Sequence, residues 1–246
     1  MAKKPLGRVI SVVGVKGGVG KTSTAVIVSA LLARAGYKVA VIDTDPQGTA
    51  FKWGQARKES KIYEQVYMFS HVLDHGLSEV VRNLVNDYDF IIIDTQGQNN
   101  TAIGNSIYAC HYAITPLPPR AFDTWSIYQT ANIIAQANET RVKLGLPVVR
   151  PLLYINMAKP RSPELSDMLE FLATDDKSKQ IFRYAETIIF DRVQYSRKAS
   201  DGGAVTDYDG ADVQEEKNWF VSLVNELLDG KFKVVLKSKS KDNVGV

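Results

Sequence analysis

The fold of this chain is decided by the stretch Val15-Lys16-Gly17-Gly18-Val19-Gly20-Lys21-Thr22. It stands between a β-branched run over 8–14 and a helical pattern over 21–35. Its end matches the phosphate-binding loop G-x-x-x-x-G-K-[ST], although Val15 replaces the first glycine. The glycines let backbone N–H groups point at phosphate oxygens, and the following helix adds its positive dipole end. The stretch therefore predicts a nucleotide site in which Lys21 contacts the β- and γ-phosphates and Thr22 binds Mg²⁺.

Outside this loop, short apolar runs alternate with longer helical patterns. Continuous apolar strands between helices indicate a parallel sheet that is covered on both faces. Right-handed crossovers then predict an α/β fold with a doubly wound, mostly parallel sheet and helices on both faces. The expected strands cover 8–14, 38–43, 90–94, 112–116 and 148–156, and the expected long helices cover 21–35, 123–144 and 211–228. Such sheets bind ligands at the carboxyl ends of their strands.

Two of those strand ends carry carboxylates. Asp43-Thr44-Asp45-Pro46-Gln47-Gly48 follows the second expected strand, and Asp94 ends the apolar run 90–93. Carboxylates beside a phosphate site position Mg²⁺ or orient an attacking water. The sequence therefore predicts a metal site at Thr22, Asp45 and Asp94.

The composition sets limits on the class of protein. The chain has 246 residues, of which 45% are hydrophobic and 23% charged, with a net charge of +3 and one cysteine. That balance indicates a globular protein, and a single cysteine excludes a disulfide framework or a cysteine-rich metal site within one chain. No apolar run reaches the ~18 residues of a membrane span. We expect one domain over 1–230, a flexible basic tail over 231–246, and a cytoplasmic location without stable membrane insertion.

Lys16 is a second lysine in the loop, which one nucleotide in one subunit does not need. Lys-Gly-Gly-Val-Gly-Lys-Thr over 16–22 resembles the deviant Walker A motif of the ParA/MinD family of ATPases. In that family the extra lysine reaches the phosphates of a partner subunit across a nucleotide-sandwich dimer. Val15 and the motif over 43–48 are similar to the ParA side of the family. The resemblance implies ATP as the nucleotide and Lys16, Lys21 and Asp45 as catalytic residues, with Asp45 orienting water.

The resemblance also extends to weaker matches. Asp94 stands at the Walker B position, but Thr95-Gln96-Gly97-Gln98 departs from the small residues and prolines that often follow it. Asp-x-x-Gly occurs at the γ-phosphate sensor of GTPases, so Gly97 is expected to be a sensor, while the role of Gln96 stays open. Asn156 stands where many relatives contact the base, and an ordinary turn would explain it equally well. The expected ATP-binding residues are Lys16, Gly17, Gly18, Val19, Gly20, Lys21, Thr22, Ser23, Gly97 and Asn156.

The resemblance implies a function as well as a fold. Such proteins are slow, Mg²⁺-dependent ATP hydrolases that dimerise on ATP and bind non-specific DNA. They release the DNA when a centromere-binding, ParB-like adaptor stimulates hydrolysis. We therefore expect a nucleoid-associated homodimer that segregates DNA, in the first place a plasmid. The expected DNA contacts are Arg192, Arg197 and Lys198, with the lysine-rich tail over 231–241 as a secondary contact.

Two other functions share these motifs. A MinD-like membrane-associated ATPase would need a C-terminal amphipathic helix, whereas the segment 231–237 is short and alternates with period two at first. An accessory ATPase of conjugative DNA transfer would share every motif, and only its binding partners would distinguish it. An iron–sulfur relative is rejected, because Cys110 stands alone in an apolar stretch.

Overall fold

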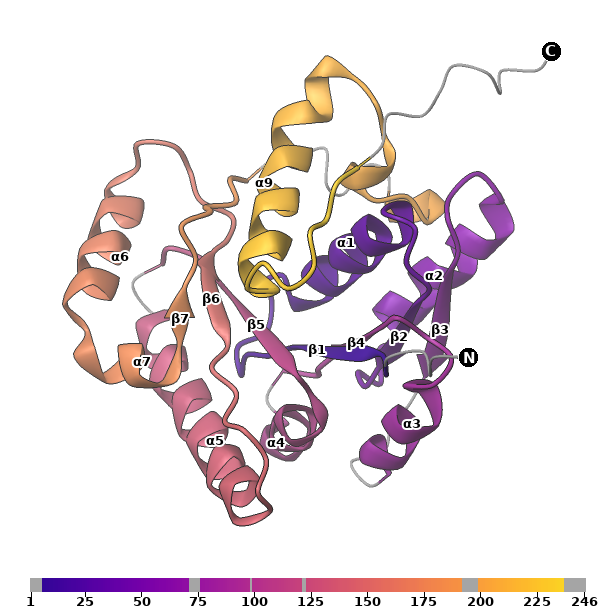
Figure 1. The fold of residues 1–246 in the computed structure, drawn as a ribbon. Coiled ribbons are helices and arrows are strands. Elements are labelled where there is room, and N and C mark those ends of the chain that lie inside the picture. The colour runs from indigo at the N-terminus through magenta and orange to yellow at the C-terminus, as the bar shows by residue number, and fades with distance from the viewer. Residues whose placement is uncertain (1–5, 71–75, 98, 121–122, 192–198, 237–246) are drawn as a thin grey trace.

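The computed structural model describes residues 6–70, 76–97, 99–120, 123–191 and 199–236. Within them lies one seven-stranded sheet with the strand order β3-β2-β4-β1-β5-β6-β7 (Figure 1). Every strand pairs in parallel with its neighbours. The predicted doubly wound α/β class is therefore confirmed.

The strands are β1 (Arg8–Val12), β2 (Val39–Asp43), β3 (Val66–Ser70), β4 (Phe90–Asp94), β5 (Tyr112–Leu117), β6 (Leu152–Ile155) and β7 (Arg183–Tyr184). The helices are α1 (Lys21–Arg34), α2 (Thr49–Ser60), α3 (Leu77–Leu84), α4 (Asn100–Ala109), α5 (Asp123–Lys143), α6 (Pro163–Thr174), α7 (Asp176–Ile181) and α9 (Ala211–Leu227). Two 3₁₀ turns, η1 (Ala199–Asp201) and η2 (Val205–Asp207), precede α9.

The core consists of two layers, one on each face of the sheet. Side chains alternate along a strand, so Ile10 and Val12 of β1 face one layer while Val9 faces the other. The first layer includes α1, α2 and α9, and the second includes α3, α4, α5 and α6 (Figure 1). The apolar stripe of α9 packs into the first layer, where Leu223 and Leu227 are fully buried. Because helices cover both faces, the ends of the strands are the part of the sheet that neither layer covers.

The fifth long strand of the sequence prediction is shorter than expected. The prediction covers 148–156, whereas β6 covers Leu152–Ile155. The Asn138 side chain of α5 binds both the carbonyl and the N–H of Val149, at 2.9 and 2.8 Å. These two hydrogen bonds hold the segment before Leu152 against α5, so that segment does not join the sheet.

Residues that follow α9 pack against the sheet and against α9. The Phe232 ring packs edge-on against Phe90 with centroids 5.3 Å apart, and Val234 is 1% exposed. The backbone N–H of Val234 donates to Asn225 Oδ1 at 2.8 Å. Phe232 and Val234 therefore pack on the body of the protein, the domain bounds stay a prediction, and the rest of the expected tail, 237–246, lies outside the described residues.

None of the helices in the described part of the chain combines the length and the apolar character needed to cross a membrane.

Candidate functional site

The predicted phosphate loop connects β1 to α1 at the carboxyl edge of the sheet. Gly20 precedes α1 with φ +98°, in the left-handed region that glycine favours. A Cβ at Gly20 would also lie 2.4 Å from Asn156 Nδ2, so the loop has no room for a side chain there. Val19 is 4% exposed and anchors the loop in the protein, while Gly17 and Gly18 remain exposed. The backbone of the loop at Gly17 and Gly18 is therefore exposed to solvent, while the buried Val19 side chain holds the loop in place.

Lys21 begins α1 and turns back toward its own loop. Its side chain is 7% exposed, and Nζ donates to the carbonyl oxygen of Lys16 at 2.8 Å. Burial lowers the pKa of Lys21, while the carboxylates of Asp94 and Asp45 act against burial. The ammonium group is thus held at the loop with two carboxylates close enough to affect it.

Asp94 ends β4 with an unsatisfied carboxylate. The residue is 1% exposed, and neither carboxylate oxygen has a hydrogen-bond partner in the described structure. Burial raises the pKa of Asp94 to about 7, which the Thr22 hydroxyl and the Lys21 ammonium only partly oppose. A buried carboxylate that lacks partners is costly unless it is paired or binds a metal.

This donor set fits Mg²⁺. Mg²⁺ takes oxygen ligands, keeps several waters, and is bound by one or two carboxylates together with substrate phosphates. Asp94 and the Thr22 hydroxyl are such oxygens, and they lie at the phosphate loop. Within the described ranges no group of three or more His, Cys, Asp or Glu residues forms a complete metal cage. Mg²⁺ bound in this way keeps several waters and takes phosphate oxygens of the nucleotide as further ligands.

The two aspartates after β2 have different environments. Asp43 is fully buried, and its carboxylate accepts the N–H groups of Asp45 and Phe51 at 3.0 and 2.9 Å. Asp43 therefore fixes the loop between β2 and α2. Asp45 is only half-buried, and its Oδ1 accepts the Gln47 N–H at 2.9 Å. Its carboxylate also raises the pKa of Lys21, which places the expected water-orienting group at the phosphate site.

Gly97 lies directly against the phosphate loop. A Cβ on Gly97 would stand 3.0 Å from Lys21 Nζ and 3.5 Å from the Gly17 nitrogen. A side chain at this position would therefore require Lys21 Nζ to shift, whereas the Gly17 nitrogen would be in ordinary contact. The predicted sensor position is thus at the phosphate loop, although its contact with a phosphate stays a prediction.

The sequence prediction missed two threonines that join the strand ends. The Thr44 hydroxyl donates to the carbonyl of Asp94 at 2.9 Å and accepts the N–H of Gln96 at 3.3 Å. The Thr95 hydroxyl donates to the carbonyl of Val12 at 2.7 Å. These bonds tie the ends of β1, β2 and β4 together. Their only sequence signal is a threonine directly after each aspartate-ended strand.

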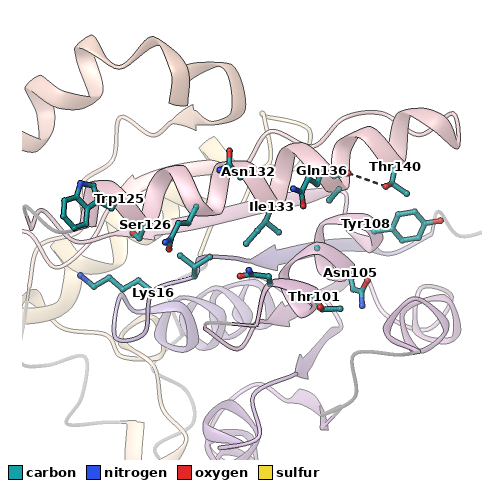
Figure 2. Close-up of a pocket in the computed structure, with 15 residues that line it drawn as sticks. Lys16, Thr101, Asn105, Tyr108, Trp125, Ser126, Asn132, Ile133, Gln136 and Thr140 are labelled. Atoms are coloured by element: carbon teal, nitrogen blue, oxygen red, sulfur yellow. Dashed lines mark hydrogen bonds between the residues drawn. The ribbon is translucent and has the colours of Figure 1, made fainter.

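The remaining predicted residues divide into three groups. Asn156 is 7% exposed and its Nδ2 donates to the Val19 carbonyl at 2.9 Å, so it supports the loop, and its contact with a base stays a prediction. Lys16 is half-buried at the rim of a groove between α4 and α5 (Figure 2), and Ser23 is exposed on α1. Arg192, Arg197 and Lys198 lie outside the described residues.

Comparison with known families agrees with this geometry. The model of the CobQ/CobB/MinD/ParA nucleotide binding domain matches residues 10–203. The matched segment contains the phosphate loop, both aspartate-ended strands and Asn156. The chain belongs to this family of nucleotide-binding proteins.

Two relatives and one solved structure show how similar this chain is to individual proteins, with identities of 29%, 27% and 20%. The chain is 29% identical over 157 residues to the maintenance of carboxysome distribution protein A of Halothiobacillus neapolitanus, covering 62% of this chain and 68% of the relative. It is 27% identical over 131 residues to the protein ParA of Rhizobium radiobacter, covering 53% of this chain and 58% of that protein. The structure is similar to a putative plasmid partition protein of Borrelia burgdorferi bound to AMPPNP, with a TM-score of 0.65, 20% identity, and 89% and 99% of the two chains covered.

Proposed function

We propose that this chain is a slow, Mg²⁺-dependent ATP hydrolase whose ATP-driven dimerisation partitions a cargo along DNA. The observation that carries the proposal is the different placement of two lysines in one loop. Lys21 is buried and bonded to its own loop, whereas Lys16 lies at the rim of an open groove (Figure 2). A lysine at the rim can serve a phosphate in a second subunit, while the buried one serves its own nucleotide.

The site residues divide the chemistry among them. Lys21 neutralises charge on the β- and γ-phosphates, and Asp45 orients the water that attacks the γ-phosphorus. Thr22 and Asp94 would hold Mg²⁺, which supplies charge stabilisation on the phosphate oxygens when bound. Lys16 of the partner would complete each site. Because hydrolysis then needs both subunits, ATP turnover is coupled to assembly.

The cargo and track are inferred from the family. The phosphate loop resembles that of ParA proteins, and the relative in Rhizobium radiobacter carries the name ParA. On that resemblance we take DNA as the cargo, plasmid DNA first, with a centromere-binding adaptor and a location on the nucleoid. The relative in Halothiobacillus neapolitanus is named for carboxysome distribution, which favours a protein compartment as a second candidate cargo. A partner from conjugative DNA transfer, or binding to lipid, would identify the other two alternatives.

Subunit mixing tests the core of this proposal. Lys16→Ala should bind ATP but fail to hydrolyse it, and Asp45→Ala should accumulate as an ATP-bound dimer without turnover. Mixing the two variants should restore part of the hydrolysis, because one site of the mixed dimer has both groups. Lys58→Ala, which removes an exposed lysine from α2, is the control and should behave as wild type. Normal turnover by Lys16→Ala alone would contradict the cross-subunit role.

DNA binding is tested separately. Titration of non-specific duplex DNA should show tight binding with ATP, weak binding with ADP or no nucleotide, and a steep loss with salt. Replacing both Arg197 and Lys198 by alanine should flatten the salt dependence by about one to two units. Binding that ignores the nucleotide would show that DNA is not the track of an ATP switch.

A further inference from the structure

Exposed apolar side chains gather at the turn that follows α5. Ten large apolar side chains are exposed in the described part of the chain, and four of them are Val142, Leu144, Leu146 and Val148. Between 38% and 59% of each of these four is exposed. Single exposed apolar residues are ordinary, whereas a contiguous group marks an interaction surface. We call these four residues the α5 patch.

Hydrogen bonds fix the turn that carries the patch. The buried Arg141 donates from Nε to the carbonyl of Pro147 at 2.8 Å and from Nη1 to the carbonyl of Ile107 at 3.0 Å. The N–H of Leu146 donates back to the Arg141 carbonyl at 2.9 Å, and Gly145 takes φ +71° between them. The turn is thus held in a conformation that leaves its aliphatic side chains in water.

A cavity of about 570 Å³ opens beside the patch. It lies between the second half of α5 and α7, and Val142 and Val148 of the patch line it. Ala135 of α5 and Ile181 of α7 complete the apolar part of the lining. The volume falls within the range of about 300–1000 Å³ that is typical of ligand pockets, so apolar groups of a partner can enter it.

The charged residues that line the cavity give it a net positive charge. Lys143 and Arg150 are its cations, and Glu139 is its acid. Nη2 of Arg150 donates to the carbonyls of Lys179 and Phe182 at 2.6 and 3.0 Å, which holds the guanidinium group at the end of α7. A complementary surface therefore combines aliphatic groups with a carboxylate that faces Lys143 and Arg150.

The extent of the patch favours a protein as the occupant. Leu144 and Leu146 do not line the cavity, so a small molecule inside it would leave them in water. An anionic lipid surface attracts each Lys or Arg by about 1 kcal/mol, and the single net positive charge of the lining supplies little of that attraction. A protein surface can fill the cavity and cover the neighbouring leucines at once.

The backbone of the occupant must satisfy its own polar groups. Side chains of two helices and one turn line the cavity, so an extended segment would leave main-chain N–H and C=O groups unpaired over aliphatic carbon. A helix pairs those groups internally and presents apolar residues at spacings of three and four. We propose that the α5 patch and its cavity bind an amphipathic helix of a partner protein, whose carboxylates face Lys143 and Arg150.

The patch lies at the opposite edge of the sheet from the phosphate loop (Figure 1). The chain passes through α5 from the carboxyl end of β5 to the amino end of the parallel strand β6, so the last turn of α5 reaches the amino edge. A second subunit that contributes Lys16 would lie at the carboxyl edge. The helix should therefore bind equally with ATP, with ADP and without nucleotide, and its binding does not rest on the proposed function.

Two displayed libraries of alanine-based helices test the binding. Both randomise aliphatic and aromatic residues at positions spaced by three and four, and they differ only in carrying glutamate or lysine beside that face. Full-length protein without nucleotide should enrich helices from the glutamate library alone. The enriched helices are then synthesised and titrated by fluorescence anisotropy, with each nucleotide in turn.

Variants of the patch check where the helices bind. Val142→Ala/Val148→Ala should bind them about tenfold more weakly, because two apolar contacts are lost. Lys143→Glu should weaken binding about fivefold, because it places like charges together. All three positions are exposed, so both variants should keep the thermal unfolding midpoint of wild type. Leu169→Ala on α6 and Lys58→Glu on α2 change exposed residues elsewhere and should leave the affinity unchanged.

Three results would overturn the proposal. The first is no enrichment above a matrix without protein, or equal enrichment from both libraries. The second is equal binding by wild type and both patch variants, or binding that requires ATP. The third is a different occupant, seen as self-association without nucleotide or pelleting with phosphatidylglycerol vesicles that Val142→Ala/Val148→Ala abolishes while no helix binds. Absent ATP hydrolysis together with variant-sensitive helix binding would contradict only the proposed function.

Discussion

Among the regions of this protein that bury charged side chains, two satisfy those charges to very different degrees. One is a clamp between α2 and η2, formed by Arg57 and Asp207, whose side chains are both fully buried. The other is the phosphate site, where Lys21 and Asp94 are buried at the edge of the sheet. Their hydrogen bonding separates a structural ion pair from a ligand site.

In the clamp, each guanidinium nitrogen of Arg57 and each carboxylate oxygen of Asp207 has a hydrogen-bond partner. Arg57 donates from both terminal nitrogens to the two carboxylate oxygens of Asp207, at 2.7 and 2.9 Å. Its remaining donors reach the carbonyls of Gly202 and Glu64, at 3.0 and 2.8 Å. The Asp207 carboxylate also accepts the N–H of Ala204 at 2.7 Å. Such a bidentate pair offsets its own desolvation, so it can remain buried without a ligand.

At the phosphate site, by contrast, a buried charged group is left without a hydrogen-bond partner. Asp94 has no hydrogen-bond partner within the described structure. Burial raises the pKa of Asp94 and lowers the pKa of Lys21, so both shifts favour the neutral form of the side chain. Buried charge without partners is tolerated where a ligand supplies them, and perturbed pKa values gather at functional sites. The two regions therefore differ in bonding: the clamp pairs its buried charges, whereas the buried carboxylate of Asp94 at the phosphate site has no hydrogen-bond partner in the described structure.

The largest effect is expected from breaking the clamp. Asp207→Ala leaves the Arg57 guanidinium buried and unpaired, which should lower the free energy of unfolding by about 3–5 kcal/mol. Urea denaturation without nucleotide measures it. Asp176→Ala, at the exposed pair with Lys179, is the matched control and should cost less than about 1 kcal/mol. Equal losses in both variants would contradict the distinction between a satisfied buried pair and a surface pair.

The opposite sign is expected at Asp94. Its pKa rises from the ordinary 3.8 to about 7 on folding, so the folded state keeps a proton that the unfolded state has released. Stability is therefore lost as pH rises from about 4 to 7, and the cost is complete above that range. Asp94→Asn should raise the free energy of unfolding by about 2–4 kcal/mol at pH 8.

The pH dependence provides the check on Asp94. Urea denaturation in EDTA without nucleotide should show the gain shrinking as the pH falls toward about 4, because the carboxyl group is then neutral in both states. The same variant should lose Mg²⁺-dependent hydrolysis. A gain that does not change with pH would show that charge burial is not its cause.

A smaller effect is expected from crowding Lys21. Gly97→Ala would place a methyl group 3.0 Å from Lys21 Nζ, so the ammonium group must shift. We expect about a tenfold weaker affinity for ATP, which corresponds to about 1.4 kcal/mol. Titration with a fluorescent ATP analogue measures it. Gly104→Ala, at a glycine of α4 where a Cβ would meet only Ile133 at 4.0 Å, is the control and should not change the affinity. Unchanged affinity in Gly97→Ala would contradict its place at the phosphates.

The smallest effect is expected at Asn156. Asn156→Ala removes the hydrogen bond to the Val19 carbonyl, and one such bond contributes about 1 kcal/mol. Loss of loop support alone should weaken ATP and GTP binding equally. A contact with the base would instead change the preference between the two nucleotides, so competition between them separates the two roles.

Much of the candidate site could be predicted from local sequence. Gly-Lys-Thr between a strand and a helix defines the phosphate loop, and the aspartates at strand ends follow from apolar runs that stop at an acid. These signals are local because a loop and its two flanking elements come from one continuous segment. The clamp has no such signal, since 150 residues separate Arg57 from Asp207.

The sequence by itself determined the α/β class, the phosphate loop and the residues at the strand ends, because period and turn chemistry act over a few residues. Only the tertiary structure decided which buried charges are paired, where Asn156 supports the loop, and that α4 and α5 leave a groove beside it. Those features depend on desolvation and on contacts between distant segments. Neither quantity exists until the helices have packed on the sheet.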